Sequence, residues 1–208
     1  TYVGKTIHNI DTTVGSETFA QVTSYGNGPL QGANIKKITF TNVDTVKGNL
    51  FHSFTKLPEI VFPEGLTALP DDFYAYSFIE EVTIPASIEK LGASVFESCV
   101  NLKKITFADG SKLKEIGNYA FSKCIKLETL VLPETIDTVG TQIFRYDVSL
   151  KKLIIPESFP INNNMSFTGF GSDQTVYFRI AEDVRYRTLV YNFADGCDAN
   201  FVFGYKGN

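Results

Sequence analysis

The sequence predicts an α/β solenoid, and three features of the chain predict it. A pattern of 22 to 25 residues recurs between residues 35 and 170. Each copy holds apolar residues at fixed spacing, followed in most copies by proline. A phenylalanine recurs at nearly the same interval. Such a period is typical of stacked repeats, because one copy is too short to bury its own apolar face.

The first half of each copy predicts a β-strand that ends in a turn. Two apolar columns lie two residues apart, so their side chains share one face of a strand. Proline then ends the strand, because it has no N–H for the ladder. The columns read Ile38, Ile60, Val82, Ile105, Leu130, Leu153 and Phe40, Phe62, Ile84, Phe107, Leu132, Ile155. We therefore expect parallel strands stacked in register.

The second half of each copy predicts a helical turn that carries a buried phenylalanine. Residues 117–122 have helical character but are too few to form a stable helix alone. We expect the recurring phenylalanines to stack into a continuous core, called here the aromatic spine. Its predicted members are Phe51, Phe73, Phe96, Phe121, Phe144 and Phe167.

The chain is expected to form a single domain with atypical ends. Residues 1–34 are predicted to form a degenerate N-terminal repeat or cap, with a loop insertion rich in Gly, Asn and Pro. Residues 35–170 are predicted to hold about six repeats. The period is expected to stop at Phe170, so that residues 171–208 form a C-terminal α+β cap with helical character at 181–191.

Composition excludes two classes of partner. The net charge of −4 is small and both signs are mixed along the chain, so a nucleic-acid surface is not expected. No apolar stretch reaches the roughly 18 residues of a membrane span, so membrane insertion is not expected either.

The cysteines allow two interpretations. Cys99 and Cys124 each lie three residues after a spine phenylalanine. They could form a disulfide or half of a metal site between adjacent repeats, or they could be buried thiols that act as small apolar side chains. The repeat itself sets their position and no Cys/His cluster supports zinc, which favours buried thiols. Cys197 lies in a Gly/Asp loop and is interpreted as a free thiol.

No catalytic constellation is recognisable, and neither a metal nor a cofactor is expected. The residues considered were His8, His52, Asp71 and Asp72, and a loop with Asp195, Asp198 and Asn200. The aspartates just before Phe73 suit helix capping better than paired carboxylate chemistry. The loop lacks the remainder of an EF-hand pattern.

The pattern L-x-x-[IV]-x-[FI]-P, followed by I-x-x-[IL]-G-x-x-x-F-x-x-C, resembles the BspA-type leucine-rich repeats. Residues 57–156 match it closely. The resemblance implies a leucine-rich-repeat, right-handed superhelix with a parallel sheet on its concave side and short turns or helical turns on the other. It also implies a secreted or cell-surface protein of the kind found in mucosal bacteria and some protozoa, several of which are implicated in adhesion.

The outward residues of the predicted strands form the first candidate binding surface. One row reads Lys37, Glu59, Glu81, Lys104, Thr129, Lys152, and its neighbour reads Thr39, Val61, Thr83, Thr106, Val131, Ile154. A structural interpretation is also open, in which threonine and valine serve strand propensity and the charges serve solubility. The rows lack Tyr, Trp and Arg anchors, so any affinity from them is expected to be weak.

A second candidate surface lies in the predicted cap. Its residues are Tyr177, Arg179, Arg185, Tyr186, Arg187 and Tyr191, whose types suit an interface. They equally suit a cap whose tyrosines pack on the stack, which is the favoured interpretation.

These observations predict a non-catalytic scaffold for protein recognition or adhesion at the cell surface, with an extracellular or host protein as partner. A carbohydrate or cell-wall binding module is the alternative, with a glycan as partner, although the outward rows show no aromatic platform. A structural spacer in a larger surface protein is a third interpretation. The oligomeric state stays open.

Overall fold

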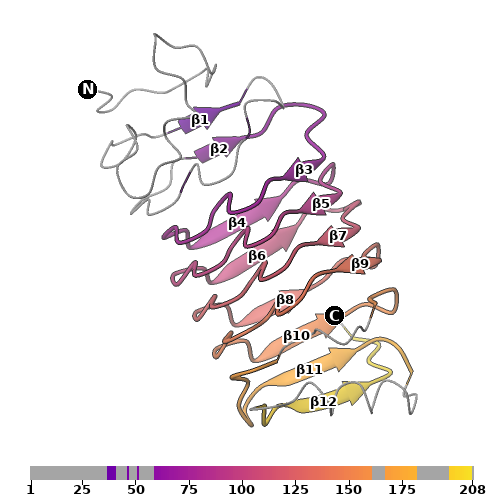
Figure 1. Cartoon of the computed structure of the whole chain (residues 1–208). Coiled ribbons are helices and arrows are strands. Elements are labelled where there is room, and N and C mark those ends of the chain that lie inside the picture. The colour runs from indigo at the N-terminus through magenta and orange to yellow at the C-terminus, as the bar shows by residue number, and fades with distance from the viewer. Residues whose placement is uncertain are drawn as a thin grey trace.

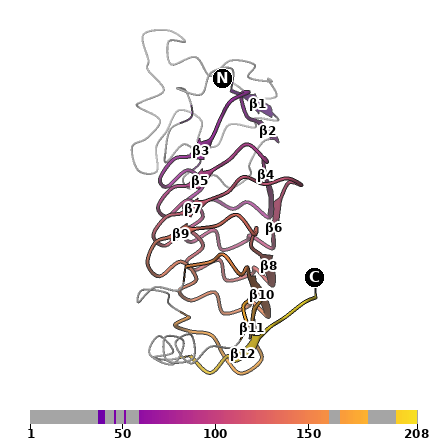
Figure 2. The same cartoon turned by 90° about the vertical axis from the view of Figure 1, so that its right-hand side faces the viewer.

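The computed structural model describes residues 37–40, 46, 51, 59–160, 167–181 and 197–207. In this part of the chain, parallel strands stack as successive coils of a solenoid (Figure 1), with two sheets on opposite sides of the central coils (Figure 2). The predicted parallel-sheet solenoid is confirmed. No helix of the described residues is long and apolar enough to cross a membrane.

Three parallel sheets build the solenoid. The largest contains β4 (Glu81–Ile84), β6 (Lys104–Phe107), β8 (Thr129–Val131), β10 (Lys152–Ile155), β11 (Thr175–Phe178) and β12 (Asn200–Phe203). The opposite sheet contains the short strands β3 (Ala68–Leu69), β5 (Lys90–Leu91), β7 (Glu115–Ile116) and β9 (Thr138–Val139). The third sheet pairs β1 (Lys37–Thr39) with β2 (Glu59–Val61).

The strand columns predict the observed register, and the register continues beyond the predicted boundary. Val82 pairs with Ile105 in the sheet, as the columns require. The same register then carries Leu153 onto Val176 and Val176 onto Phe201. The expectation that the period stops at Phe170 is therefore wrong for the strands: β11 and β12 extend the same sheet, and no separate cap is seen among the described residues. The predicted helical character at 181–191 falls almost entirely outside them.

Stacked aromatic rings form the centre of the core. Phe96, Phe121, Phe144 and Phe167 are fully buried, and successive rings lie 5.9, 6.0 and 6.1 Å apart with nearly parallel planes. Tyr74 continues this stack, 5.3 Å from Phe96. The predicted member Phe73 is buried beside the stack and meets Tyr74 edge-on at 4.7 Å. The register of the spine is thus one residue off in that coil, where two aromatic residues are adjacent.

The segments that carry the spine are not helical turns, and the described residues contain no helix. Two residues in each coil adopt left-handed backbone angles, one on each side of the stacked aromatic residue, with φ between 52° and 63°. They are Asp72, Tyr76, Ser94, Ser98, Tyr119, Lys123, Gln142 and Tyr146. This geometry turns backbone N–H groups along the solenoid axis and away from the i−4 carbonyls that a helix would use.

Hydrogen bonds between these segments all run in one direction. Within the part of the chain that the structure describes, each N–H donates to a carbonyl of the following coil, three bonds at each of three junctions and one at the fourth. Phe96 N donates to Ala120 O at 2.9 Å, and Phe121 N donates to Ile143 O at 3.0 Å. The third side of each coil therefore forms a ladder in which every N–H group points toward the following coil. In the two sheets, by contrast, N–H groups point alternately toward the following and the preceding coil.

Candidate recognition surface

The outward side chains of the six-stranded sheet form two rows across its strands, called here the sheet face. Inward residues such as Ile105 and Leu130 are buried, and their neighbours along the strand are exposed. The register places one row as Glu81, Lys104, Thr129, Lys152, Thr175 and Asn200. The other row is Thr83, Thr106, Val131, Ile154, Tyr177 and Val202. The surface is therefore continuous over several coils.

Most of the predicted binding residues lie on the sheet face. Those that are exposed are Glu81, Thr83, Lys104, Thr106, Thr129 and Val131. Val61 and Lys152 are half-buried. Lys37, Thr39 and Glu59 lie in β1 and β2, where Lys37 pairs with Glu59, but their side chains fall outside the described part of the structure.

Ile154 was expected to be an exposed binding residue, and this is wrong because its side chain is fully buried. Tyr177 follows it in the row, and the ring of Tyr205 packs on Tyr177 at 4.5 Å between centroids. The Lys152 ammonium lies 5.9 Å and 5.5 Å from the two ring centroids. The segment after β12 leaves the sheet on its outer side (Figure 2), and Tyr205 N donates to Phe178 O.

Sequence reasoning named Tyr177 only as a residue of the predicted cap and missed its pairing with Tyr205 on the sheet. Tyr177 and Tyr205 are both half-buried, so part of each ring is open to solvent. The outward position of Tyr177 on the sheet could have been found, because Val176 and Phe178 repeat the two-residue spacing of the strand columns and the residue between them must point outward. Tyr205 lies beyond the last strand, where no column predicts it.

The sheet face contains a groove between β6 and β8. The coil that starts with β6 has 25 residues, against 22 or 23 in its neighbours, and the two strands are paired only between Lys104 and Thr129. A concavity of about 780 Å³ lies at this point. Its lining includes Lys104, Thr106, Asp109, Glu128, Val131 and Glu134. The longer coil thus interrupts a regular surface and leaves a hollow with both signs of charge.

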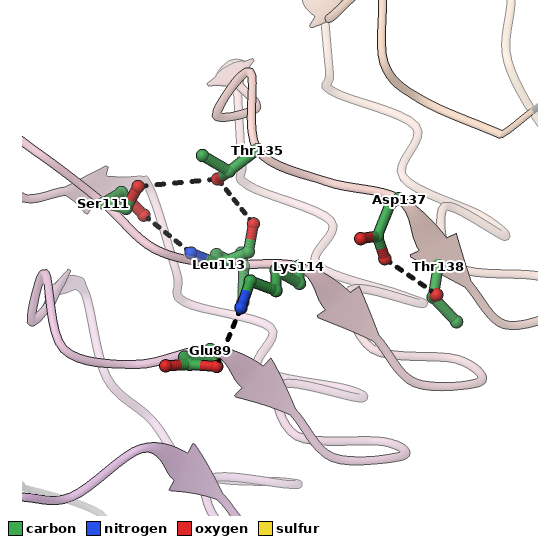
Figure 3. Close-up of polar contacts among 7 residues, drawn as sticks. All are labelled: Glu89, Ser111, Leu113, Lys114, Thr135, Asp137 and Thr138. Atoms are coloured by element: carbon green, nitrogen blue, oxygen red, sulfur yellow. Dashed lines mark hydrogen bonds and ion pairs between the residues drawn. The ribbon is translucent and has the colours of Figure 1, made fainter.

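The loop of the longer coil is held by the neighbouring coils (Figure 3). Thr135 Oγ1 donates to Leu113 O at 2.6 Å, and Leu113 N donates to Ser111 Oγ at 3.4 Å. Lys114 Nζ forms an ion pair with Glu89 of the preceding coil at 3.1 Å. Ser111 and Thr135 line the groove, whereas the Glu89–Lys114 pair lies outside its lining.

The second candidate surface is only partly described. Arg179 forms an ion pair with Glu134, which also lines the groove. Arg185, Tyr186 and Arg187 lie outside the described residues. The structure therefore places Arg179 on the side of the six-stranded sheet. The role of Arg185, Tyr186 and Arg187 stays a prediction.

Small polar groups form a buried column next to the spine, and this column contains two of the cysteines. Its members are Ser77, Cys99, Cys124 and Asp147, all fully buried. The Cys99 thiol donates to Tyr74 O at 3.1 Å, and the Cys124 thiol donates to Phe96 O at 3.2 Å. Burial raises the pKa of Cys99 to about 12 and raises the pKa of Cys124 well above its ordinary value. Both cysteines are free thiols that serve the core, whereas Cys197 is half-buried.

Asp147 places a carboxyl group in this column. Its Oδ1 accepts a bond from Cys124 N at 2.8 Å, whereas its Oδ2 is buried and has no hydrogen-bond partner among the described residues. Burial raises the pKa of this carboxyl well above its ordinary value, so the neutral acid is the form that suits the site. The other column members carry a thiol or hydroxyl proton, and a protonated Asp147 does the same.

Asp147 is expected to make stability depend on pH. Its pKa is raised on folding, so its favourable contribution is complete below about pH 4, the pKa of an unfolded aspartate, and is lost as pH rises through the folded pKa. The slope approaches about 1.4 kcal/mol per pH unit where unfolding releases one full proton. Urea unfolding of the Asp147→Asn variant between about pH 5 and pH 8 should lack this decline. The exposed Asp109→Asn variant should keep it, and an equal slope in both variants would contradict the assignment.

Among the described residues, those considered for catalysis or metal binding lie apart, with Asp71 and Asp72 after β3 and Asp198 and Asn200 at β12. Asp71 Oδ1 accepts a bond from Ala93 N of the next coil at 2.7 Å, so it caps a neighbouring coil and not a helix. Asn200 Nδ2 donates to Ser172 O at 2.9 Å. His8, His52 and Asp195 lie outside the described residues. In the described ranges, no three His, Cys, Asp or Glu side chains gather in a way that could hold a metal ion.

Comparison with known proteins agrees with this architecture. A profile described as the BspA type leucine rich repeat region, in six copies, matches residues 7–103 and 89–186. The crystal structure of the pneumococcal vaccine antigen PcpA is similar, with 31% identity and a TM-score of 0.57. That similarity covers 76% of this chain and 42% of the PcpA chain, so the chain spans less than half of that relative.

Two further solved structures are similar at lower identity. The Treponema pallidum leucine-rich repeat protein has 20% identity and a TM-score of 0.55, covering 91% of this chain and 82% of its own. A leucine-rich cell surface protein from Faecalibacterium prausnitzii A2-165 has 16% identity and a TM-score of 0.46, covering 85% and 49%. No curated protein sequence matches the chain.

Proposed function

Because this chain belongs to the BspA-type leucine-rich repeat family, we propose that it is a non-catalytic scaffold that recognises an extracellular or host protein and mediates adhesion at the cell surface. Repeats of this family form scaffolds that are typically non-catalytic. The similarity to a vaccine antigen at 31% identity supports exposure outside the cell. The resemblance suggests that the molecule is a right-handed superhelix with the sheet face on its concave side, where solenoids commonly bind.

The observation that carries this proposal is the continuous exposed part of the sheet face over β4, β6 and β8. Thr83, Thr106 and Val131 offer short, stiff side chains that lose little conformational entropy when a partner covers them. Glu81 and Lys104 stand beside them with opposite charges. The groove between β6 and β8 gives this surface a shape that a partner's side chain could enter. Such a surface favours selective but weak binding, which repetition on a cell surface would strengthen.

The proposal is tested by reversing the charges of the exposed row. In the variant Glu81→Lys with Lys104→Glu, capture of an extracellular host protein by the immobilised chain is expected to fall about tenfold or more. The matched control is Glu89→Lys with Lys114→Glu, which exchanges an ion pair on the opposite sheet side. Equal losses in both variants, or no loss in either, would contradict recognition through the sheet face.

A carbohydrate or cell-wall partner is the second candidate, and the Tyr177–Tyr205 pair favours it. Two partly exposed rings beside the Lys152 ammonium supply the aromatic platform that the sequence did not show. Binding to a glycan array that disappears in the Tyr177→Ala variant and persists in the charge-reversed variant would establish this candidate in place of the first.

A further inference from the structure

The turns that lead into β4, β6, β8 and β10 follow one another along one edge of the solenoid (Figure 1). Each turn carries an apolar side chain that is exposed or, in the case of Val100, half-buried. Each of four successive coils places an apolar residue there, namely Phe78, Val100, Ile125 and Val148. Tyr76 and Tyr146 lie two residues before the first and last of them. We call these six residues the apolar edge.

The concentration at this edge is not a matter of chance exposure. Seven large hydrophobic residues are exposed in the described part of the chain, and five of them belong to the apolar edge. Phe78 is 39% exposed, Ile125 39% and Val148 48%. The core does not need them, because Cys99, Cys124 and Asp147 already fill the inward positions of the same turns. A contiguous exposed apolar patch is typical of an interaction site.

The spacing of the apolar edge favours a partner with the same repeat. Its residues are one coil apart, and coils of a parallel sheet are about 4.8 Å apart. An extended peptide lying along the edge would present side chains about 6.7 Å apart on one side, which does not match. A second copy of this solenoid matches at every coil, because its own edge has the identical spacing.

Charge along the edge determines the direction of pairing. The four turns span residues 76–80, 97–103, 122–128 and 145–151. Their charged residues are Glu80; Glu97 and Lys103; Lys123, Lys126 and Glu128; Arg145 and Lys151, with buried Asp147 set aside. The net charges are therefore −1, 0, +1 and +2 along the chain. Antiparallel pairing places the acidic first turn of one copy against the basic fourth turn of the other, whereas parallel pairing opposes like charges.

We propose that two copies of this chain associate side by side through the apolar edge, antiparallel about a twofold axis. The axis passes between Val100 and Ile125, so that Phe78 of each copy lies against Val148 of the other. Such an interface is isologous and closes on itself, which prevents growth into filaments. The interface leaves both sheet faces free. The dimer goes beyond the proposed function, since dimerisation and recognition through the sheet face do not depend on each other.

The edge is short, so the association is expected to be weak. Four coils span about 15 Å, less than the interface of a standard stable complex, which buries roughly 800 Å² on each partner. A dimer of this kind forms at micromolar or higher concentrations, which crowding on a surface supplies. Pairing would then present two sheet faces together and raise their avidity for a repeated partner.

Sedimentation velocity of the full chain from low to high micromolar concentration tests the proposal. The wild-type chain is expected to shift from monomer to dimer. The variant with Phe78→Ser, Ile125→Ser and Val148→Ser should weaken dimerisation about tenfold or more, with an unchanged circular dichroism spectrum. The control variant, Val131→Ser with Val202→Ser on the sheet face, should dimerise like the wild type. The proposal would be overturned if the wild-type chain stayed monomeric, even if its edge captured a different protein. It would also be overturned if all three chains dimerised equally.

Charge exchange tests the antiparallel direction. The Glu80→Lys variant alone and the Lys151→Glu variant alone should each dimerise more weakly than the wild type. An equimolar mixture of the two restores both opposite-charge pairs of an antiparallel dimer and should recover association. Failure of the mixture to exceed either variant alone would overturn the antiparallel arrangement.

Discussion

Replacement of Phe121 by alanine is expected to lower the free energy of unfolding by about 3–5 kcal/mol. The ring is fully buried and stacks on Phe96 and Phe144, so its removal leaves a cavity that two rigid neighbours cannot close. Ring pairs of this kind contribute about 0.5–1.5 kcal/mol beyond the area that they bury, and two such pairs are lost. Because each coil is stable only with its neighbours, the loss falls on the whole stack and not on one coil.

The chain has no tryptophan, so far-ultraviolet circular dichroism is used to follow urea unfolding and to measure the loss of free energy. Phe121→Leu is the matched control, because it keeps much of the apolar volume while it loses both ring pairs, and it should cost less than the alanine variant. A loss below about 1 kcal/mol for the alanine variant would show that the spine is not a closely packed core.

Gly117→Ala is expected to destabilise the fold by about 3 kcal/mol or more, at the upper end of overpacking effects. A Cβ at this position would lie 2.5 Å from Ala93 N and 2.6 Å from Gly92 C, which are backbone atoms of the preceding coil. Neither atom can move without separating β5 from β7, which Gly117 N reinforces by donating to Leu91 O. Gly92 and Gly140 are equally confined in their coils, so the position is a steric requirement of stacking.

Thermal unfolding of the Gly117→Ala variant checks this result. The control is Gly171→Ala, whose Cβ would meet only the Asp173 carboxylate at 3.3 Å and should change stability by less than about 0.5 kcal/mol. Similar melting temperatures for both alanine variants would show that the coils have room for a Cβ atom at Gly117.

The sheet could be predicted from the sequence because a strand column combines two local rules, alternation and the loss of N–H at proline. Alternation holds at Val82, Ile105 and Leu153, where the observed register agrees with the columns, and proline follows the strand of the first and the last. Alternation holds equally at Val176 and Phe201, where the phenylalanine and proline markers are absent and the period was expected to end. The strands persist there because parallel pairing requires only the alternation.

The rest could not be predicted, because tertiary contacts decide it. The segment at 117–122 has helical composition, but stacking turns its N–H groups toward the next coil, which a single repeat does not reveal. Two adjacent aromatic residues made Phe73 and Tyr74 indistinguishable as spine members. Ile154 is buried beside Tyr177, on which Tyr205 packs from a position that belongs to no repeat. The longer coil was visible as a 25-residue interval, but its effect on the pairing of β6 and β8 was not.

The one-directional ladder beside the spine gives the molecule an electrical axis. Peptide dipoles of about 3.5 D that point the same way add, as they do in a helix, whereas those in a sheet largely cancel. Since N–H groups face the following coil, the positive pole lies toward β12 and the negative pole toward β3. Two solenoids lying side by side in opposite directions bring unlike poles together, so the backbone itself favours the orientation that the charged turns select.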